Sequence, residues 1–310
     1  MILILAPAAT VFAQEENDLF LVVSPSSPAP NQGFSVEAKT FQFDASRAYF
    51  EWFKDGKKID EGVGITKKIF PGEKLGTRTR ISAVSAENSA SADISVNDID
   101  FIINSFTYTP FGYRGAALAT PGSVAEIYAI PHIFSNGRRI SSTGLTYEWS
   151  IEGSPVQEQS GRGKNKLTIS IPKIPQGDVT VSLNVFSGEQ LVAQKKEKVE
   201  IHSPQIVFYK TNSLLGKGAK ALSEFTSPPG AEFALAAEPF FFDFNSIVRG
   251  VVSWLANGTK IEPSRADNLF VLELSSAPNE ESESNILFKI GDEKNVFQNK
   301  EGRINIKIRN

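Results

Sequence analysis

All three tryptophans of this 310-residue chain begin the same eight-residue frame, whose fourth residue is Asp, Glu or Asn, whose fifth is Gly and whose eighth is Ile or Val. The frames are Trp52-Phe53-Lys54-Asp55-Gly56-Lys57-Lys58-Ile59, Trp149-Ser150-Ile151-Glu152-Gly153-Ser154-Pro155-Val156 and Trp254-Leu255-Ala256-Asn257-Gly258-Thr259-Lys260-Ile261. Consecutive tryptophans lie roughly 100 residues apart, and self-similarity with such a period indicates copies of one domain. The frame therefore predicts three tandem domains, at residues 18–98, 99–203 and 204–310.

Each frame also predicts a strand that enters a tight hairpin. Asp-Gly, Asn-Gly and, more weakly, Glu-Gly suit a type I′ turn, because both of its central residues need a positive φ. Side chains alternate along a strand, so the residues two before each tryptophan should share its buried face; they are Phe50, Tyr147 and Val252. We expect the last residue of each frame to begin the return strand on that same face; these residues are Ile59, Val156 and Ile261.

Other alternating runs surround the frames. Upstream of each tryptophan, a run that ends in Ala follows a turn rich in Pro or Gly; the runs are 34–38, 125–129 and 233–237. Later runs close each repeat, among them 80–84, 179–185 and 304–308. No stretch combines a sustained helical period with helix caps. Short strands and frequent turns predict an all-β fold of β-sandwiches.

The composition excludes several function classes. Hydrophobic residues make up 41% of the chain and the net charge is −3 without a basic block, so we expect a globular protein that does not bind nucleic acid. The absence of cysteine removes thiol catalysis, zinc–cysteine sites and iron–sulfur clusters. His132 and His202 stand outside any HExxH motif, and no G-x-S-x-G motif occurs. The sequence therefore predicts no catalytic, cofactor-binding or metal-binding residues, and a protein that is not an enzyme.

Acidic pairs were weighed as sites and judged to be solvated. Asp98 and Asp100 would suit calcium at a domain junction, but no Asp-rich loop recurs at the second junction, so a plain linker is preferred. Paired carboxylates that hydrolyse glycosides would have to come from this pair or from the polar segment 280–283. Both segments are interpreted as exposed connections.

The N-terminus is apolar from Met1 to Phe12, and Val11-Phe12-Ala13 stands directly before Gln14-Glu15-Glu16. Small or aliphatic residues before a polar start are typical of a signal-peptidase site. We interpret residues 1–13 as the remnant of a signal peptide whose start lies upstream, with a mobile tail or a first strand as the alternative. The expected location is therefore secreted or in the cell envelope, with no membrane span after signal removal.

The order of Pro-Gly turn, alternating strand, tryptophan strand, hairpin and late alternating strands resembles the immunoglobulin-like and PKD-like modules of bacterial surface proteins, over residues 18–310. The cysteine pair of antibody domains and the W-x-F-G-D-G turn of PKD domains are absent. The whole chain is similar to secreted Ig-like repeat proteins of small-genome bacteria, which implies the cell envelope. Because the linkers near residues 97–100 and 202–204 are short, we expect an extended array of three Ig-like domains.

The second and third repeats share an entry segment that the first repeat lacks. Residues 101–118 and 206–222 both hold aromatic residues, then glycine beside a basic residue, then Ala-Leu. Exposed aromatics beside Arg or Lys would suit a sugar ring or a partner chain, whereas buried ones would be inter-domain packing. Packing is preferred, both here and for the run 240–244. The candidate ligand or interface residues are Tyr108, Phe111, Tyr113, Arg114, Tyr209, Lys210 and Lys217.

Together these features predict a non-enzymatic, exported Ig-like repeat protein that acts as an envelope spacer or a protein-interaction module. One alternative is an adhesin or carbohydrate-binding protein that uses the aromatic entry segments. Another is an accessory subunit of a surface fibre or pilus, joined by strand addition. The expected partner is a protein or a glycan, and the expected state is a monomer.

Overall fold

The computed structural model describes residues 19–86, 88–135, 137–212, 214–263 and 268–309. The signal-peptide prediction for residues 1–13 lies outside them. Within the described residues the chain is nearly all β, with one α-helix and two single-turn 3₁₀ helices. These are α1 (Phe244–Arg249), η1 (Ser142–Gly144) and η2 (Gln157–Gln159). No helix of the described residues is long and apolar enough to cross a membrane.

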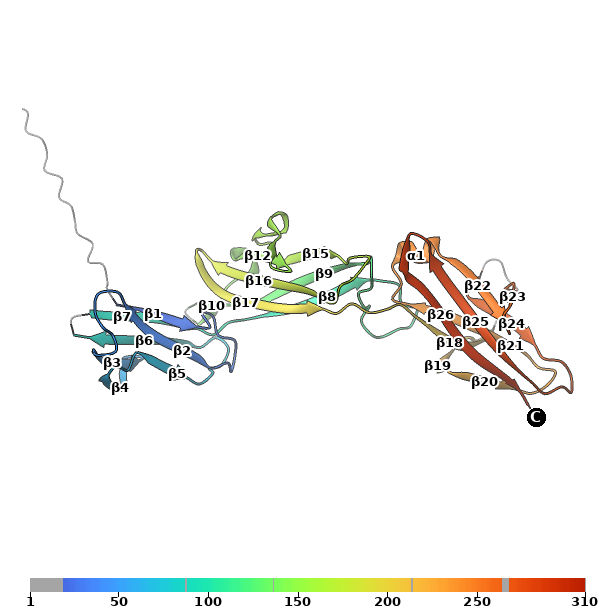
Figure 1. Ribbon diagram of the computed structural model, residues 1–310, viewed down its shortest axis with the longest axis horizontal. Helices are drawn as coiled ribbons and strands as arrows, with labels where there is room; N and C mark the ends of the chain where they lie inside the picture. The colour runs from blue at the N-terminus through green and yellow to red at the C-terminus, as the bar shows by residue number, and fades with distance from the viewer. Residues whose placement is uncertain (1–18, 87, 136, 213, 264–267, 310) are drawn as a thin grey trace, which may run out of the picture. The chain divides into compact units, whose positions relative to one another are not determined.

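The first repeat is a pair of antiparallel sheets (Figure 1). One sheet has the order β1-β2-β5 and the other the order β4-β3-β6-β7, with the tryptophan on β3. The core between the sheets contains Trp52, Phe50 and Ile81, all fully buried. The strands are β1 (Leu19–Ser24), β2 (Phe34–Thr40), β3 (Tyr49–Lys54), β4 (Lys57–Val63), β5 (Lys67–Phe70), β6 (Arg78–Ser85) and β7 (Asn88–Ser95).

The second repeat has the same plan. Its sheets have the orders β15-β9-β8 and β13-β12-β16-β17, and the short β14 also pairs with β12, the tryptophan strand. A small hairpin, β10 with β11, follows β9. The strands are β8 (Asp98–Phe106), β9 (Val124–His132), β10 (Phe134–Ser135), β11 (Arg138–Arg139), β12 (Thr146–Ile151), β13 (Ser154–Pro155), β14 (Gly161–Arg162), β15 (Lys166–Ser170), β16 (Val179–Ser187) and β17 (Gln190–Val199).

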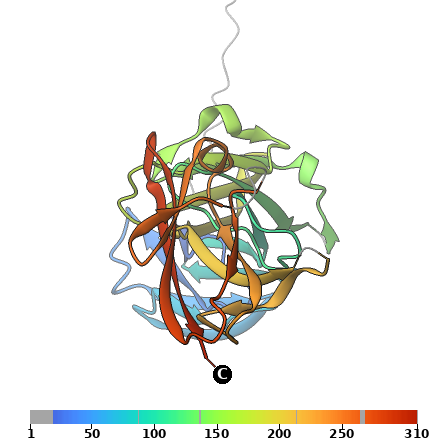
Figure 2. The same cartoon turned by 90° about the vertical axis from the view of Figure 1, so that its right-hand side faces the viewer.

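The third repeat adds two strands to this plan. Its sheets have the orders β19-β18-β21-β24 and β20-β26-β25-β22-β23, and β25 and β26 run side by side as a long hairpin in both views (Figures 1 and 2). The strands are β18 (Gln205–Asn212), β19 (Gly216–Leu222), β20 (Glu224–Ser227), β21 (Glu232–Phe240), β22 (Val251–Ala256), β23 (Thr259–Ile261), β24 (Val271–Ser275), β25 (Ser282–Asp292) and β26 (Asn295–Ile308).

The strand order around each tryptophan is the same in all three repeats. The tryptophan strand lies between its hairpin partner and the next-to-last strand of the repeat, and the last strand follows at the far side. The other sheet places the first, second and fifth strands of the basic plan together. Two such antiparallel sheets packed face to face are the immunoglobulin-like sandwich. The prediction of an all-β, tandem Ig-like fold is therefore confirmed.

The chain divides into two compact units that do not follow the repeat boundaries. Of the described residues, one unit contains 19–100 together with 131–145 and 184–195, and the other contains 101–130, 146–183 and 196–309. The boundaries of three separate domains stay a prediction.

All three hairpins have the predicted turn. The central residues Asp55 and Gly56 have φ values of 51° and 80°, and the corresponding pairs at 152–153 and 257–258 have 49° and 79°, and 49° and 84°. Two positive values in succession define type I′. The strands that flank each two-residue turn pair with one another: Lys54 with Lys57, Ile151 with Ser154, and Ala256 with Thr259.

The expectation for Ile59 was wrong. Ile59 is 42% exposed, whereas Ile261 pairs with Trp254 and packs against its core. The reason is a register shift in the first hairpin, where Trp52 pairs with Asp60 and Phe53 with Lys58, so Ile59 is an extra residue. A bulge of this kind turns the inserted side chain away from the face that the alternation predicts.

A repeated indole contact ties the sheets of each sandwich together. The Nε1–H groups of Trp52, Trp149 and Trp254 donate to the carbonyls of Ile65, Lys164 and Leu269, at 2.6, 2.9 and 2.9 Å. The carbonyl of the following residue accepts the backbone N–H of the Ala that ends each upstream alternating run. One short connection thus satisfies a buried tryptophan from one sheet and a buried strand of the other, which explains why both recur.

Candidate functional site

The entry segment of the second repeat is hydrogen-bonded to the third repeat, within one compact unit. Thr107 forms an antiparallel bridge with Asp243. The Tyr108 N–H donates to the Phe242 carbonyl at 2.7 Å, and the Phe241 N–H donates to the Tyr108 carbonyl at 2.6 Å. Backbone pairing of this kind fixes the direction of a segment as a strand ladder does. Residues 107–108 therefore act as an extra strand beside 241–243.

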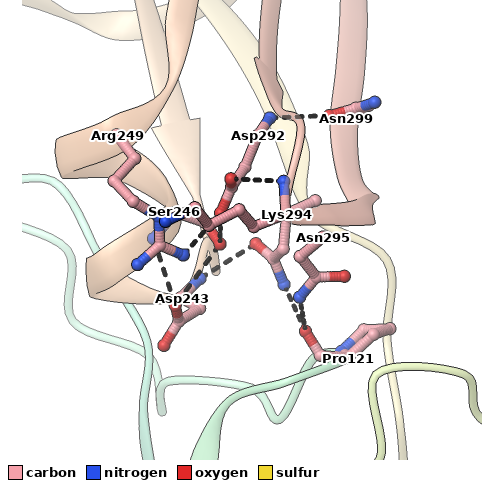
Figure 3. Close-up of polar contacts among 9 residues, drawn as sticks. Pro121, Asp243, Ser246, Arg249, Asp292, Lys294, Asn295 and Asn299 are labelled. Atoms are coloured by element: carbon pink, nitrogen blue, oxygen red, sulfur yellow. Dashed lines mark hydrogen bonds and ion pairs between the residues drawn. The ribbon is translucent and has the colours of Figure 1, made fainter.

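Buried side chains complete this junction (Figure 3). The Gln298 Nε2 donates to the Pro121 carbonyl at 2.8 Å and to the Thr120 Oγ1 at 3.0 Å, and its Oε1 accepts the Asp243 N–H at 2.9 Å. The Thr120 hydroxyl donates to the Phe241 carbonyl at 2.8 Å. Thr120 and Gln298 are both buried. Gln298 thus binds both repeats at once, and its hydrogen-bonding groups are occupied.

Asn295 adds a second amide to the same carbonyl. Its Nδ2 donates to the Pro121 carbonyl at 2.9 Å, which sets the orientation of the amide, because the flipped form would place two oxygens together. Its Oδ1 is buried and has no hydrogen-bond partner among the described residues. Gly122 lies next to the Asn295 amide, because a Cβ on Gly122 would stand only 2.5 Å from the Asn295 Nδ2. The junction therefore requires glycine at position 122.

A buried carboxylate supports the junction from the side of the third repeat. The Asp292 Oδ2 accepts hydrogen bonds from the Ser246 hydroxyl at 2.8 Å and from the Arg249 guanidinium at 2.7 Å (Figure 3). Its Oδ1 accepts the Lys294 N–H at 2.9 Å. Asp243 caps α1 by accepting the Ser246 N–H at 3.1 Å. The helix, the β25–β26 turn and the entry segment are thereby joined in one polar cluster.

These contacts set the charge state of Asp292. Burial by itself raises the pKa of this carboxyl, but hydrogen bonds from Arg249, from the Lys294 backbone and from Ser246 together hold its pKa at about 2. Asp292 is therefore ionised at neutral pH, and the guanidinium of Arg249 balances its charge. All donors to this carboxylate come from the third repeat itself. The ion pair therefore has a structural role within that repeat.

Phe241 adopts a conformation that bulky residues rarely adopt. Its φ is +62°, and its side chain is 5% exposed. A left-handed backbone at a non-glycine residue costs on the order of 1–3 kcal/mol and persists only where the surroundings hold it. Here the Phe241 N–H is bound by the Tyr108 carbonyl of the entry segment, and the Phe241 carbonyl by the Thr120 hydroxyl just after that segment. The strain is therefore a consequence of the junction.

The structure places the seven predicted residues in three groups. At the junction, Tyr113 packs edge-on against Phe240 and Phe241, with ring centroids 5.5 and 5.7 Å apart. Tyr108 packs edge-on against Phe244 at 6.3 Å, and burial raises its pKa, with a smaller contribution from Glu238. Phe240, Phe241 and Phe242 are buried, as the packing interpretation expects, whereas Phe244 is half exposed.

Phe111 and Arg114 point away from this packing. Pro110 and Tyr113 close a turn whose backbone hydrogen bond is 3.1 Å, and Gly112 within it has a φ of +85°. Phe111 is fully exposed in this turn, and Arg114 is exposed just after it. Tyr113, which closes the turn, is itself 40% exposed, so a ligand could reach residues 111–114 in the entry segment of the second repeat.

Tyr209, Lys210 and Lys217 lie on the β18–β19 hairpin. The Lys217 Nζ lies 5.1 Å above the Tyr209 ring and 3.2 Å from a Glu238 oxygen, and the Lys210 Nζ lies 5.6 Å above the Phe225 ring. Burial raises the pKa of Tyr209, and Glu238 adds to the effect. The expected loop after the strand is itself the strand β19 in this repeat, so the two entry segments differ in structure.

The two acidic residues interpreted as a linker belong to a strand. Asp98 and Asp100 are the first and third residues of β8, and the Asp100 carboxylate lies 2.9 Å from the His132 Nε2. Among the described residues, no group of three His, Cys, Asp or Glu side chains could hold a metal ion. Sequence reasoning missed the residues that build the junction, namely Thr120, Pro121, Asp292, Asn295 and Gln298. The amides Asn295 and Gln298 are three positions apart near the start of β26, a pattern that carries no recognisable signal by itself.

Comparison with known proteins returns only distant matches among solved structures. No family model and no curated protein matches the chain. Among solved structures, the three N-terminal domains of the bacteriophage RB49 Highly Immunogenic Outer Capsid protein are 11% identical, with 94% of this chain and 99% of that chain covered and a TM-score of 0.26. The I9–I11 tandem of titin is 11% identical, with 91% and 95% covered and a TM-score of 0.23. The central fibronectin-III array of RIM-binding protein is 12% identical, with 92% and 98% covered and a TM-score of 0.32. The Ig-like assignment rests on the strand order of this chain.

Proposed function

We propose that this chain is an exported, non-enzymatic Ig-like repeat protein of a bacterial envelope that acts as a spacer, with the entry segment of the second repeat as a stiff joint to the third. The observation that carries the proposal is the polar cluster around Gln298. It binds the Thr120 hydroxyl and the Pro121 carbonyl of one repeat and the Asp243 amide of the next. A spacer needs joints of this kind, because an unrestrained linker does not hold a distance.

The aromatic residues of the joint support the same role. A sugar-binding platform presents open ring faces, but Tyr108 and Tyr113 meet their neighbours edge-on at interplanar angles of 83° and 81°. Such contacts are the usual packing of aromatic side chains inside proteins. The packed edges of both rings support a role in the joint, and so does the left-handed Phe241, whose N–H and carbonyl are bound by Tyr108 and Thr120.

A distance measurement between spin labels tests the stiff joint. The chain has no cysteine, so Ser170→Cys on β15 and Thr259→Cys at the third hairpin place two labels at exposed positions of the same compact unit. We expect a single narrow distance distribution, and a distribution at least about twice as wide after Gln298→Ala, which removes all three hydrogen bonds of Gln298 and leaves the Asp243 N–H without its acceptor. Glu293→Ala, in the turn between β25 and β26 and close in sequence to Gln298, is the matched control and should keep the narrow distribution.

Either of two results contradicts the proposal. A broad distribution in the parent chain means that the repeats move freely and that the chain is no spacer. A narrow distribution that survives Gln298→Ala means that the polar cluster does not stiffen the joint.

A second candidate function is recognition of a glycan by the exposed turn at residues 110–113, in the entry segment of the second repeat. Phe111 is fully exposed and Arg114 is exposed close to it, in contrast to Phe240, Phe241 and Phe242, which are buried. Aromatic rings and guanidinium groups at the surface suit a sugar ring and its polar substituents.

A glycan array probed with the labelled full chain tests this second function. We expect Phe111→Ala to lower the signal on any bound glycan by about tenfold, in line with the loss of one aromatic contact. Phe41→Ala, which removes another almost fully exposed phenylalanine from the first repeat, is the control. An array without bound glycans, or equal signals from both variants, would exclude recognition by this turn.

A further inference from the structure

The β18–β19 hairpin ends in two leucines that are almost entirely exposed. Leu214 and Leu215 keep 91% and 89% of their side-chain exposure. The Asn212 Oδ1 accepts the backbone N–H groups of both leucines, at 2.8 and 3.2 Å, and Gly216 follows them with a φ of +73°. Large apolar side chains exposed to this degree gain free energy when an apolar partner covers them.

The hairpin is also a basic segment of an acidic chain. Residues 205–222 contain Lys210, Lys217 and Lys220 and no acidic residue, whereas the whole chain has a net charge of −3. Lys217 is paired with Glu238 of β21 at 3.2 Å. Lys210 and Lys220 lie at exposed positions on the two strands. The two strands of the hairpin therefore carry positive charge, and the tip that joins them is apolar.

The shape and the edge of the hairpin decide which partner it fits. Two adjacent leucines that are 91% and 89% exposed present their side chains on nearly all sides, so a folded protein would need a matching cavity to cover both. Strand addition along β19 is disfavoured, because its edge carries Lys217 and Lys220 and its pairing with β18 contains a register shift between Tyr209 and Thr211. A lipid bilayer needs no matching cavity, and its anionic headgroups attract nearby lysines.

We propose that the tip of the β18–β19 hairpin binds an anionic lipid surface, with Leu214 and Leu215 inserted at the boundary between headgroups and acyl chains. Lys210 and Lys220 bind the lipid phosphates. This contact attaches the chain peripherally to a membrane. No helix of the described residues is long and apolar enough to span one. It is independent of the stiff joint proposed above, because no residue of the hairpin tip takes part in the Gln298 cluster.

Co-sedimentation of the full chain with vesicles is the first test. Vesicles of phosphatidylcholine with about 30% phosphatidylglycerol should bind the chain, and vesicles of phosphatidylcholine alone should bind it much more weakly. The double variant Leu214→Ser/Leu215→Ser should bind the anionic vesicles about tenfold less strongly or worse. Lys210→Gln and Lys220→Gln should each lower binding about fivefold. Val248→Ser, which removes an equally exposed apolar residue from α1, is the control and should bind as the parent does.

A label at the tip separates this contact from any other membrane contact of the chain. Because the chain has no cysteine, Leu215→Cys accepts one environment-sensitive dye, and Val248→Cys accepts it at the control position. We expect a blue shift of the dye at position 215 with anionic vesicles and none at position 248. Absence of the shift at 215, or unchanged sedimentation of the double serine variant, overturns the proposal.

Discussion

Replacing Trp254 by alanine is expected to lower the free energy of unfolding of the third repeat by about 3–5 kcal/mol. The indole is 1% exposed and lies against Phe288 and Phe208, with ring centroids 4.7 and 6.3 Å apart. Its Nε1–H is also the partner of the Leu269 carbonyl. The substitution therefore creates a cavity in the centre of the core and removes a buried donor from a carbonyl that it satisfied.

Urea unfolding followed by hydrogen exchange in β25 and β26 measures this loss, because these strands pack on the tryptophan. Trp254→Phe is the matched variant: it keeps most of the ring volume and should cost about 1–3 kcal/mol, mainly through the lost hydrogen bond. Exchange in β2 and β6 of the first repeat should stay unchanged, since their core is separate. A loss below about 1 kcal/mol for the alanine variant would show that the indole is not the centre of the core.

The second large effect is expected for Asp292→Ala, which should destabilise the third repeat by about 2–4 kcal/mol. The carboxylate is 2% exposed and accepts hydrogen bonds from Ser246, Arg249 and the Lys294 backbone. Its removal leaves the Lys294 amide without its acceptor and the Arg249 guanidinium without its carboxylate, and leaves the buried Ser246 hydroxyl only its 3.3 Å contact with Asp243. Asp292→Asn keeps the shape and removes the charge together with one acceptor oxygen, so it separates the ion pair from the packing.

The same carboxylate predicts how stability depends on pH. Its folded pKa of about 2 lies below the ordinary value of an aspartate, near 3.9, so the unfolded chain binds the proton more readily. The contribution of Asp292 is therefore complete above about pH 4 and is lost as the pH falls towards 2. Asp292→Asn should lack this part of the acid destabilisation.

A fluorine label makes this measurement specific. Each repeat contains one tryptophan, so a chain labelled with fluorotryptophan has one ¹⁹F resonance for each repeat. The resonance of Trp254 in urea titrations at several pH values gives the stability of the third repeat alone. Equal pH dependence in the parent chain and in Asp292→Asn would contradict the role given to this carboxylate.

The first hairpin shows how far local sequence predicts local structure. Asp55-Gly56 predicts a type I′ turn, and the turn forms, because positive φ is cheap for Gly and tolerable for Asp wherever they stand. The exposure of Ile59 could not be predicted, because it follows from one inserted residue in the pairing of β3 with β4. Register is set by two strands together, and one strand does not contain it.

The candidate residues divide in the same way. Aromatic composition marked the entry segments as unusual, and Tyr108 and Tyr113 do lie at the contact with the third repeat. Whether any of the seven predicted residues binds a ligand stays a prediction. Gln298 and Thr120 were missed because they are 178 positions apart in the chain, and neither residue type is unusual at its place.

The sequence by itself determined the all-β class, the three Trp-centred repeats and the turn at each hairpin, because these depend on alternation and backbone preferences over a few residues. The tertiary structure alone decided the joint between the second and third repeats, the strained Phe241 and the exposed leucine tip of β18–β19. These features depend on which buried donors and acceptors meet across long distances in the chain. Hydrogen bonds of this kind form only when the elements pack and their buried polar groups find partners.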